Sequence, residues 1–120
     1  MAKFGEVLAE LRLDRKLTQK ALADILHVTV GTISNYENGV HFPDIEKLID
    51  LANYFHVTTD YLLGRCTHSI SPDVFEEELI DRKTTGDVIT ILRQLSPERK
   101  QALSVILSDM EFLRAVKSLQ

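Results

Sequence analysis

Few residues of this 120-residue chain have the types and spacing that catalysis or metal binding needs. Cys66 is the only cysteine, and with His68 it offers two metal ligands in a polar, turn-rich stretch. Two ligands are too few for a convincing metal site, so we interpret Cys66 as an exposed thiol. The sequence has no phosphate-binding glycine loop, no HExxH motif and no plausible nucleophile triad. We therefore predict that the protein is not an enzyme and needs no metal or cofactor.

Composition places the chain among globular proteins. Its hydrophobic fraction is 44% and its charged fraction 27%, while its formal net charge of −4 argues against a polycation that coats nucleic acid nonspecifically. The N-terminus lacks the pattern of a secretory signal, and no apolar run approaches membrane-spanning length. We expect a cytoplasmic protein with no membrane association, whose small core favours self-association.

Positive charge is nevertheless concentrated locally. Residues 1–65 contain seven Lys or Arg residues against nine Asp or Glu residues, and four of the seven lie between Arg12 and Lys20. The cluster includes Arg15 and Lys16 and adjoins Thr18, a residue typical of a helix start. Such a position suits phosphate binding, although Lys16 and Lys20 could equally be ordinary surface charges.

Residues 27–39, HVTVGTISNYENG, must be positioned by the helices around them. Five of the thirteen are β-branched and two are glycine, so local propensity alone favours a loop or weak strand. Thr18, Thr29 and Asp44, however, each stand where an N-cap would open a helix with periodic apolar residues. Thr29 opens a helix with Ile33 and Tyr36 on one face, ending near Gly39. Helices are predicted from Phe4 to near Arg15, from 19 to 26, from 30 to 38, from 45 to 55 and from 59 to 63.

The remainder of the chain is also predicted to be helical. A polar linker at residues 65–73, RCTHSISPD, precedes a helix through Val88 to Leu95 and another opened by Ser96-Pro97-Glu98. No strand signal is convincing, so the fold class is all-α. In the last helix, spacings of three, four and three residues form a stripe that suits a seam with another helix, either across a dimer or within the chain. This seam consists of Leu103, Ile106, Met110 and Leu113.

The motif TQKALADILHVTVGTISNYENG, followed by FPDIEKLIDLANYFHVTTDYLLG, resembles the Xre family of lambda-repressor-like (Cro/CI-type) helix-turn-helix domains. The resemblance covers roughly residues 3–64. It implies a five-helix DNA-binding domain at residues 1–64, with residues 74–120 as a small helical dimerisation segment. It also implies a regulator that binds double-stranded DNA, most simply a homodimeric repressor of phage, mobile-element or bacterial origin acting on a palindromic operator.

The same resemblance assigns roles to individual positions. The second helix of the motif would enter the major groove, with Asn35 suited to a bidentate contact with adenine. The residues implied to face bases are Val30, Gly31, Thr32 and Asn35. The residues implied to contact phosphates are Lys16, Thr18, Gln19, Lys20 and Asn38. Arg12 and Glu37 would form a structural ion pair between the first and third helices.

The sequence differs from the family pattern at two histidines, and two functions other than repression remain open. His27 and His56 occupy turn positions where the family often has glycine, and such turns need positive φ; a metal or pH-sensing role is the other possibility. The protein could instead be an antitoxin whose tail binds a toxin, or an interaction module that has lost DNA binding. Further protein partners of such regulators would be an antirepressor or a protease.

Overall fold

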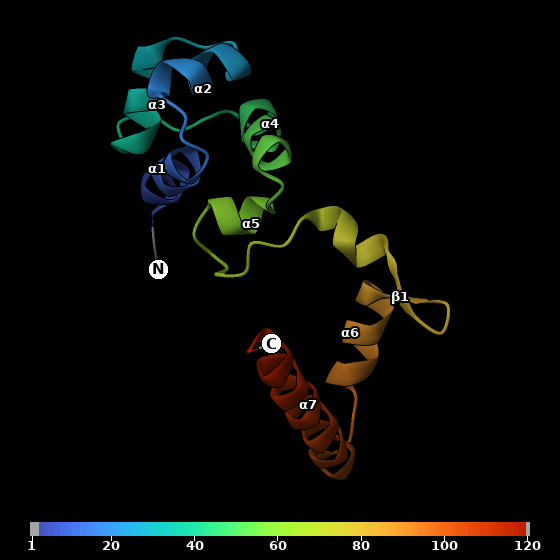
Figure 1. The fold of residues 1–120 in the computed structure, drawn as a ribbon. Coiled ribbons are helices and arrows are strands. Elements are labelled where there is room, and N and C mark those ends of the chain that lie inside the picture. Colours follow the sequence, from blue (N-terminus) through green and yellow to red (C-terminus); the bar gives the residue numbers. More distant parts are fainter. Residues whose placement is uncertain (1–2, 120) are drawn as a thin grey trace. The chain divides into compact units, whose positions relative to one another are not determined.

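The chain divides into two compact units, Met1–Val74 and Phe75–Gln120, in a computed structural model that describes residues 3–119. The predicted all-α class is confirmed, since helices dominate both units (Figure 1). Within residues 3–119, no helix is both long enough and apolar enough to cross a membrane.

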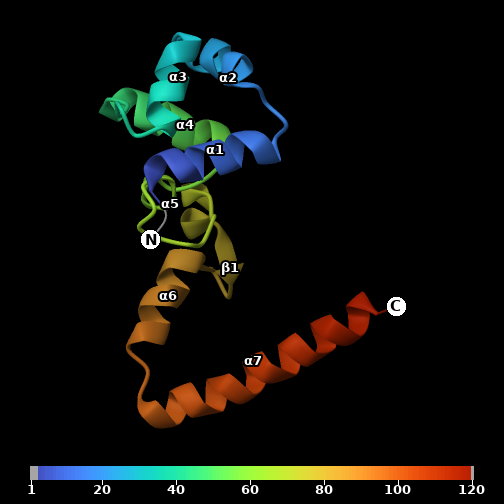
Figure 2. The same ribbon diagram turned by 90° about the vertical axis from the view of Figure 1, so that its left-hand side faces the viewer.

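The first unit contains the five predicted helices. They are α1 (Phe4–Asp14), α2 (Gln19–Leu26), α3 (Val30–Glu37), α4 (Ile45–Phe55) and α5 (Thr59–Leu62). Both views of the ribbon show α2 and α3 side by side, with α1 beside α3 (Figures 1 and 2). The stretch that propensity alone assigns to a loop is therefore helical from Val30 onward.

Side-chain caps explain why these helices begin where they do. Thr18, Thr29 and Asp44 each accept a hydrogen bond from the backbone N–H three residues further on, at 3.0, 3.1 and 2.8 Å. Each bond satisfies a donor that the first helical turn leaves without a partner. Thr58 caps α5 in the same way, at 3.0 Å. Local chemistry thus overrides the weak helix propensity of residues 28–33.

Two histidines end helices in the left-handed conformation. His27 follows α2 with φ 59°, and His56 follows α4 with φ 54°. The prediction of positive φ at both turns is confirmed. An L-residue is strained in this region, which glycine occupies at no steric cost. The two turns are alike, because each carries the chain from the end of one helix into a threonine cap.

One apolar core holds the five helices together and fixes how α3 is presented. Ile33 is fully buried and Tyr36 nearly so, and the ring of Tyr36 meets that of Phe4 edge to face at 6.3 Å between centroids. Ala23 is buried where α2 packs against its neighbours. The core consists of Phe4, Val7, Leu8, Leu22, Ala23, Leu26, Ile33, Tyr36, Leu51, Ala52, Phe55, Val57 and Leu62.

A short β-hairpin corrects the prediction that the tail contains no strand. A 3₁₀ turn spans Pro72–Glu76, and β1 (Glu78–Ile80) then pairs antiparallel with β2 (Lys83–Thr84). Asp81 and Arg82 form the connection, with φ of 48° and 62°. Positive φ at both central residues is typical of the tight hairpin turn that Asn-Gly or Asp-Gly normally supplies. With Arg in the second position, the sequence lacked that signal.

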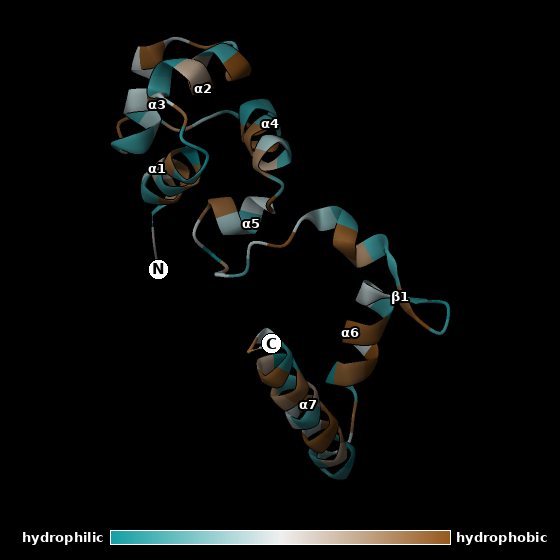
Figure 3. Cartoon of the chain, viewed as in Figure 1, coloured by the Kyte–Doolittle hydropathy of each residue, from teal (hydrophilic) through white to brown (hydrophobic). Residues whose placement is uncertain are grey.

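Two helices complete the second unit, α6 (Thr85–Arg93) and the 22-residue α7 (Pro97–Ser118). Ser96 caps α7 as predicted, accepting a hydrogen bond from the N–H of Arg99 at 3.3 Å. None of residues 75–119 is buried. Ile106, Met110 and Leu113 are 56%, 60% and 64% exposed, and apolar bands run along α7 (Figure 3). Leu103 is half-buried, so the described residues of the second unit leave most of the seam, but not all of it, uncovered.

Candidate nucleic-acid interface

The outer face of α3 is lined by short side chains. Val30, Ser34 and Asn38 follow one another at intervals of four residues, so they lie in a row along this face. Val30 and Asn38 are exposed, Ser34 is half-buried, and Gly31 beside them is exposed. Because the opposite face is anchored in the core, this row points away from the domain. An α-helix with such a slim outer face can approach another molecule closely.

Ser34 belongs to this face although the sequence interpretation did not include it. Its hydroxyl accepts a hydrogen bond from the side-chain amide of Asn38 at 3.3 Å. Its position one turn after Val30 was the signal that could have identified it. Thr32 lies on a different side of the helix, and its hydroxyl bonds that of Thr29 at 2.9 Å. A base contact by Thr32 would have to share its hydroxyl with this local bond.

Asn35 combines a fixed backbone with an available side chain. Its carbonyl accepts hydrogen bonds from the N–H groups of Val40 at 2.9 Å and His41 at 3.3 Å, which anchors the end of α3 to the following loop. Within residues 3–119, no hydrogen bond engages its side-chain amide. A half-buried side-chain amide whose donors and acceptor are not used by the described residues has the groups that a bidentate contact with adenine needs.

Arg12 and Glu37 tie α1 to α3. The guanidinium of Arg12 donates from Nε to Glu37 Oε2 at 2.7 Å and from Nη2 to Glu37 Oε1 at 3.0 Å. Its Nη1 also donates to the Leu17 carbonyl at 2.7 Å. The hydrogen bonds and negative charge of Glu37 raise the pKa of Arg12, although burial opposes this shift. The two side chains are only 11% and 8% exposed. This geometry matches the structural pair that the resemblance implies and removes Arg12 from any phosphate-binding surface.

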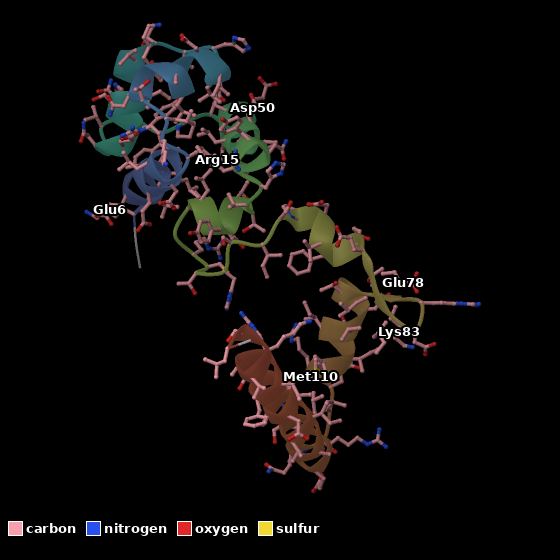
Figure 4. The ribbon with its side chains drawn as sticks, viewed as in Figure 1. Glu6, Arg15, Asp50, Glu78, Lys83 and Met110 are labelled. Atoms are coloured by element: carbon pink, nitrogen blue, oxygen red, sulfur yellow. The ribbon has the colours of Figure 1, made fainter. Side chains whose placement is uncertain are left out.

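The basic cluster is less available than its sequence suggests. Arg15 is labelled in Figure 4. Its guanidinium lies over the Tyr54 ring, 5.0 Å from the centroid, and donates to the Tyr54 carbonyl at 3.0 Å. Arg15 is still exposed although Tyr54 engages its guanidinium, whereas Arg12 is turned inward. Within the described part of the cluster, Lys16 and Lys20 are the exposed cations that make no such contact with another helix. Lys20 forms an exposed ion pair with Asp24 at 3.3 Å, which costs little to break.

The N-terminus of α2 offers a second kind of anion contact. Thr18 caps the Ala21 N–H, while the N–H groups of Gln19 and Lys20 precede the first intrahelical bond. Such amides, together with the helix dipole, favour a phosphate. The Gln19 side chain donates to Glu37 Oε1 at 3.2 Å. The phosphate contact that the resemblance implies for Gln19 therefore suits its backbone N–H better than its side-chain amide.

The helices α2 and α3 are both short and capped, a left-handed turn joins them, and α3 presents a slim face to the outside. This arrangement defines a helix-turn-helix protein. A helix-turn-helix family model (HTH_3) matches residues 8–62. The uncharacterized HTH-type transcriptional regulator YqaE of Bacillus subtilis is 37% identical over 82 residues, covering 68% of this chain and 71% of YqaE. The chain belongs to this Xre-like family of helix-turn-helix transcriptional regulators.

Other similarities extend over different parts of the chain. The cryptic phage CTXphi transcriptional repressor RstR of Vibrio cholerae is 27% identical over 117 residues, covering 98% of this chain and 95% of RstR. The regulator ImmR of B. subtilis is 41% identical over 62 residues, 52% of this chain and 49% of its own, so this chain matches about half of that relative.

Solved structures agree with this fold. The P22 c2 repressor, in complex with a synthetic operator, has a TM-score of 0.52 and 29% identity, covering 55% of this chain and 100% of its own. A transcriptional regulator from Listeria innocua has the same TM-score and identity but covers 92% of this chain and 94% of its own.

Proposed function

We propose that the protein is a dimeric repressor that binds a palindromic operator by placing α3 in the major groove. The observation that carries this proposal is the slim, outward-facing row of α3, held rigidly by its buried opposite face. Support comes from the similarity to P22 c2 repressor, which was solved on operator DNA, and from the near full-length similarity to the phage repressor RstR.

Base reading in this proposal rests on few groups. The free amide of Asn35 pairs with an adenine, and Val30 contacts a thymine methyl group. Gly31, having no side chain, lets the helix backbone approach the groove floor. Thr32 makes the remaining base contact. Ser34 joins them, since it lies in the same exposed row as Val30. No long Arg or Gln side chain takes part, so sequence specificity depends on Asn35, on contacts with thymine methyl groups and on half-site spacing.

Phosphate binding is correspondingly modest. Thr18, Gln19 and Lys20 at the start of α2 hold one phosphate, with Lys16 and Asn38 nearby contributing to the contact. The two lysines assigned to phosphate contact in each protomer give four cations per dimer, so log Kd should depend on log salt with a slope of about 4 or less. This is a weak salt dependence for a DNA-binding dimer.

Dimerisation compensates for this weak contact of one domain. The seam of α7, in which Leu103 is half-buried and Ile106, Met110 and Leu113 are exposed, is the proposed dimer interface, because an unpartnered apolar stripe on a long helix is costly in water. Replacing Ile106 and Met110 together with Glu should give monomers by sedimentation while the first unit stays folded by circular dichroism. A double variant that remains dimeric would place the interface elsewhere.

The direct test is a fluorescence-anisotropy titration of the full chain against DNA from upstream of its own gene, at several salt concentrations. A scrambled duplex of equal length and composition is the control. The proposal expects binding that discriminates between the two duplexes and weakens with salt at the modest slope given above. Equal affinity for both, or no binding, would contradict it and favour an interaction module or an antitoxin that acts through its tail.

A further inference from the structure

The seam on α7 is bounded by a cation at each end. Arg99 precedes Leu103 by four residues and Lys117 follows Leu113 by four, so both continue the spacing of the seam on the same face. Arg114 follows Met110 by four residues and borders the same face. Among residues 3–119, no ion pair engages any of these cations. Arg99 also lies in the first turn of α7, where the helix dipole disfavours a cation.

This charge pattern makes the seam a poor match for a second copy of itself. In a parallel pair of helices, Arg99 and Lys117 would each face the same residue of the other copy. In an antiparallel pair centred between Ile106 and Met110, Arg99 would face Lys117 of the other copy. Both arrangements oppose like charges across the interface, which is unfavourable. An apolar surface flanked by carboxylates would fit better.

The β-hairpin provides such a surface within the same chain. Leu79 and Ile80 on β1 are 59% and 63% exposed. Directly before and after them stand four acidic residues, of which Glu78 is shown beside Lys83 in Figure 4. Only Arg82 and Lys83 oppose them, and Lys83 is already paired with Asp81 at 3.3 Å. The acidic residues of the hairpin are Glu76, Glu77, Glu78 and Asp81.

We propose that the seam of α7 docks against the acidic hairpin of a second copy of the chain. The inference rests on the dimer proposed above and names the occupant of its interface. A second copy is the occupant because both surfaces are exposed in one chain and are complementary in charge and apolar character. Two-fold symmetry then forms the contact twice, since each chain contributes one helix face and one hairpin.

Two charge-reversal variants test this pairing without altering the apolar residues. The first replaces Arg99 and Lys117 with Glu. The second replaces Glu76 and Glu77 with Lys and spares Glu78, because Glu78 Oε1 accepts the N–H of Arg82 in the hairpin turn at 3.1 Å. Glu111→Lys is the matched control, because Glu111 is not three or four residues from Leu103, Ile106, Met110 or Leu113 and so lies on another side of α7.

Dimer dissociation is measured by analytical ultracentrifugation of the full chains at low salt, without DNA. Each charge-reversed variant alone should dimerise about tenfold more weakly than the unmodified protein, because every contact of its homodimer opposes like charges. An equimolar mixture of the two should restore dimers, because both contacts of the mixed dimer pair opposite charges. Glu111→Lys should leave the affinity unchanged.

Different failures have different meanings. If the hairpin variant dimerises normally, the hairpin is not in the interface and the inference is wrong, although the proposed dimer survives. If the mixture stays dissociated but a single chain that carries all four changes regains the dimer affinity of the unmodified protein, the contact lies within one chain. The inference is again wrong in that case. If the unmodified protein is monomeric at every concentration, the proposed dimer itself fails.

Discussion

Replacing Gly31 with Ala should have opposite effects on two properties, the stability of the free protein and its affinity for operator DNA. A Cβ at this position would meet only Thr29 Oγ1, at 3.8 Å, which is an ordinary van der Waals contact. Gly31 has no positive φ, so alanine fits the backbone without strain. The free protein should therefore tolerate the added methyl group fully.

The expected gain in stability follows from helix propensity. Alanine exceeds glycine by about 0.5–1 kcal/mol within a helix, and a gain of that size raises the melting temperature of a domain of this length by about 2–8 °C. If α3 lies in the major groove with its backbone close to the bases, the same methyl group should weaken operator binding by about tenfold. Thermal unfolding and anisotropy titration of one preparation measure both effects.

Gly5→Ala is the matched control, since it makes the same chemical change in another helix of the first unit. There a Cβ would lie 2.3 Å from the Glu37 carbonyl oxygen and 2.7 Å from that of Tyr36. Backbone atoms cannot move aside cheaply, so this variant should lower the melting temperature. A Gly31→Ala protein that is more stable and binds operator as tightly as before would refute the close approach of α3.

Three further outcomes are expected. His27→Gly should stabilise the protein by about 0.5–1 kcal/mol in denaturant unfolding, because relief of left-handed strain exceeds the added chain entropy of glycine; a loss would mean that the His27 side chain has another role. Arg12→Met should cost about 3 kcal/mol by leaving the Glu37 carboxylate poorly paired, and adding Glu37→Gln should recover part of that loss in a double-mutant cycle. Asn35→Ala should relax preference at one base pair by about 1–3 kcal/mol in competition titrations without lowering the melting temperature, and unchanged preference would contradict direct readout.

The first unit could be predicted closely because its boundaries are set by local hydrogen bonds. Thr18, Thr29 and Asp44 can be predicted as N-caps from the few residues that follow them, and each of them does cap a helix. The positive φ of His27 was expected from the family resemblance, because glycine often stands at that turn. Apolar spacing likewise distinguished the buried Ile33 from its half-buried neighbours Thr32 and Ser34.

Interactions between distant residues were harder to foresee. Arg15 counts as a surface cation in the sequence, yet its guanidinium lies on Tyr54, 39 residues away along the chain. The hairpin turn at Asp81 and Arg82 was not predicted because Arg82 stands where glycine normally follows Asp in that turn. Pairing across long separations and strained turns both depend on tertiary context that local patterns do not carry.

The central claim is that a dimer places two copies of α3 in the major groove of one operator. Hydroxyl-radical footprinting of the full chain on DNA from upstream of its own gene measures this most directly. The account predicts two protected half-sites of related, inverted sequence on one face of the duplex, with centres about 34 Å apart or a multiple of that distance. A single protected patch, or half-sites in direct repeat, would contradict it.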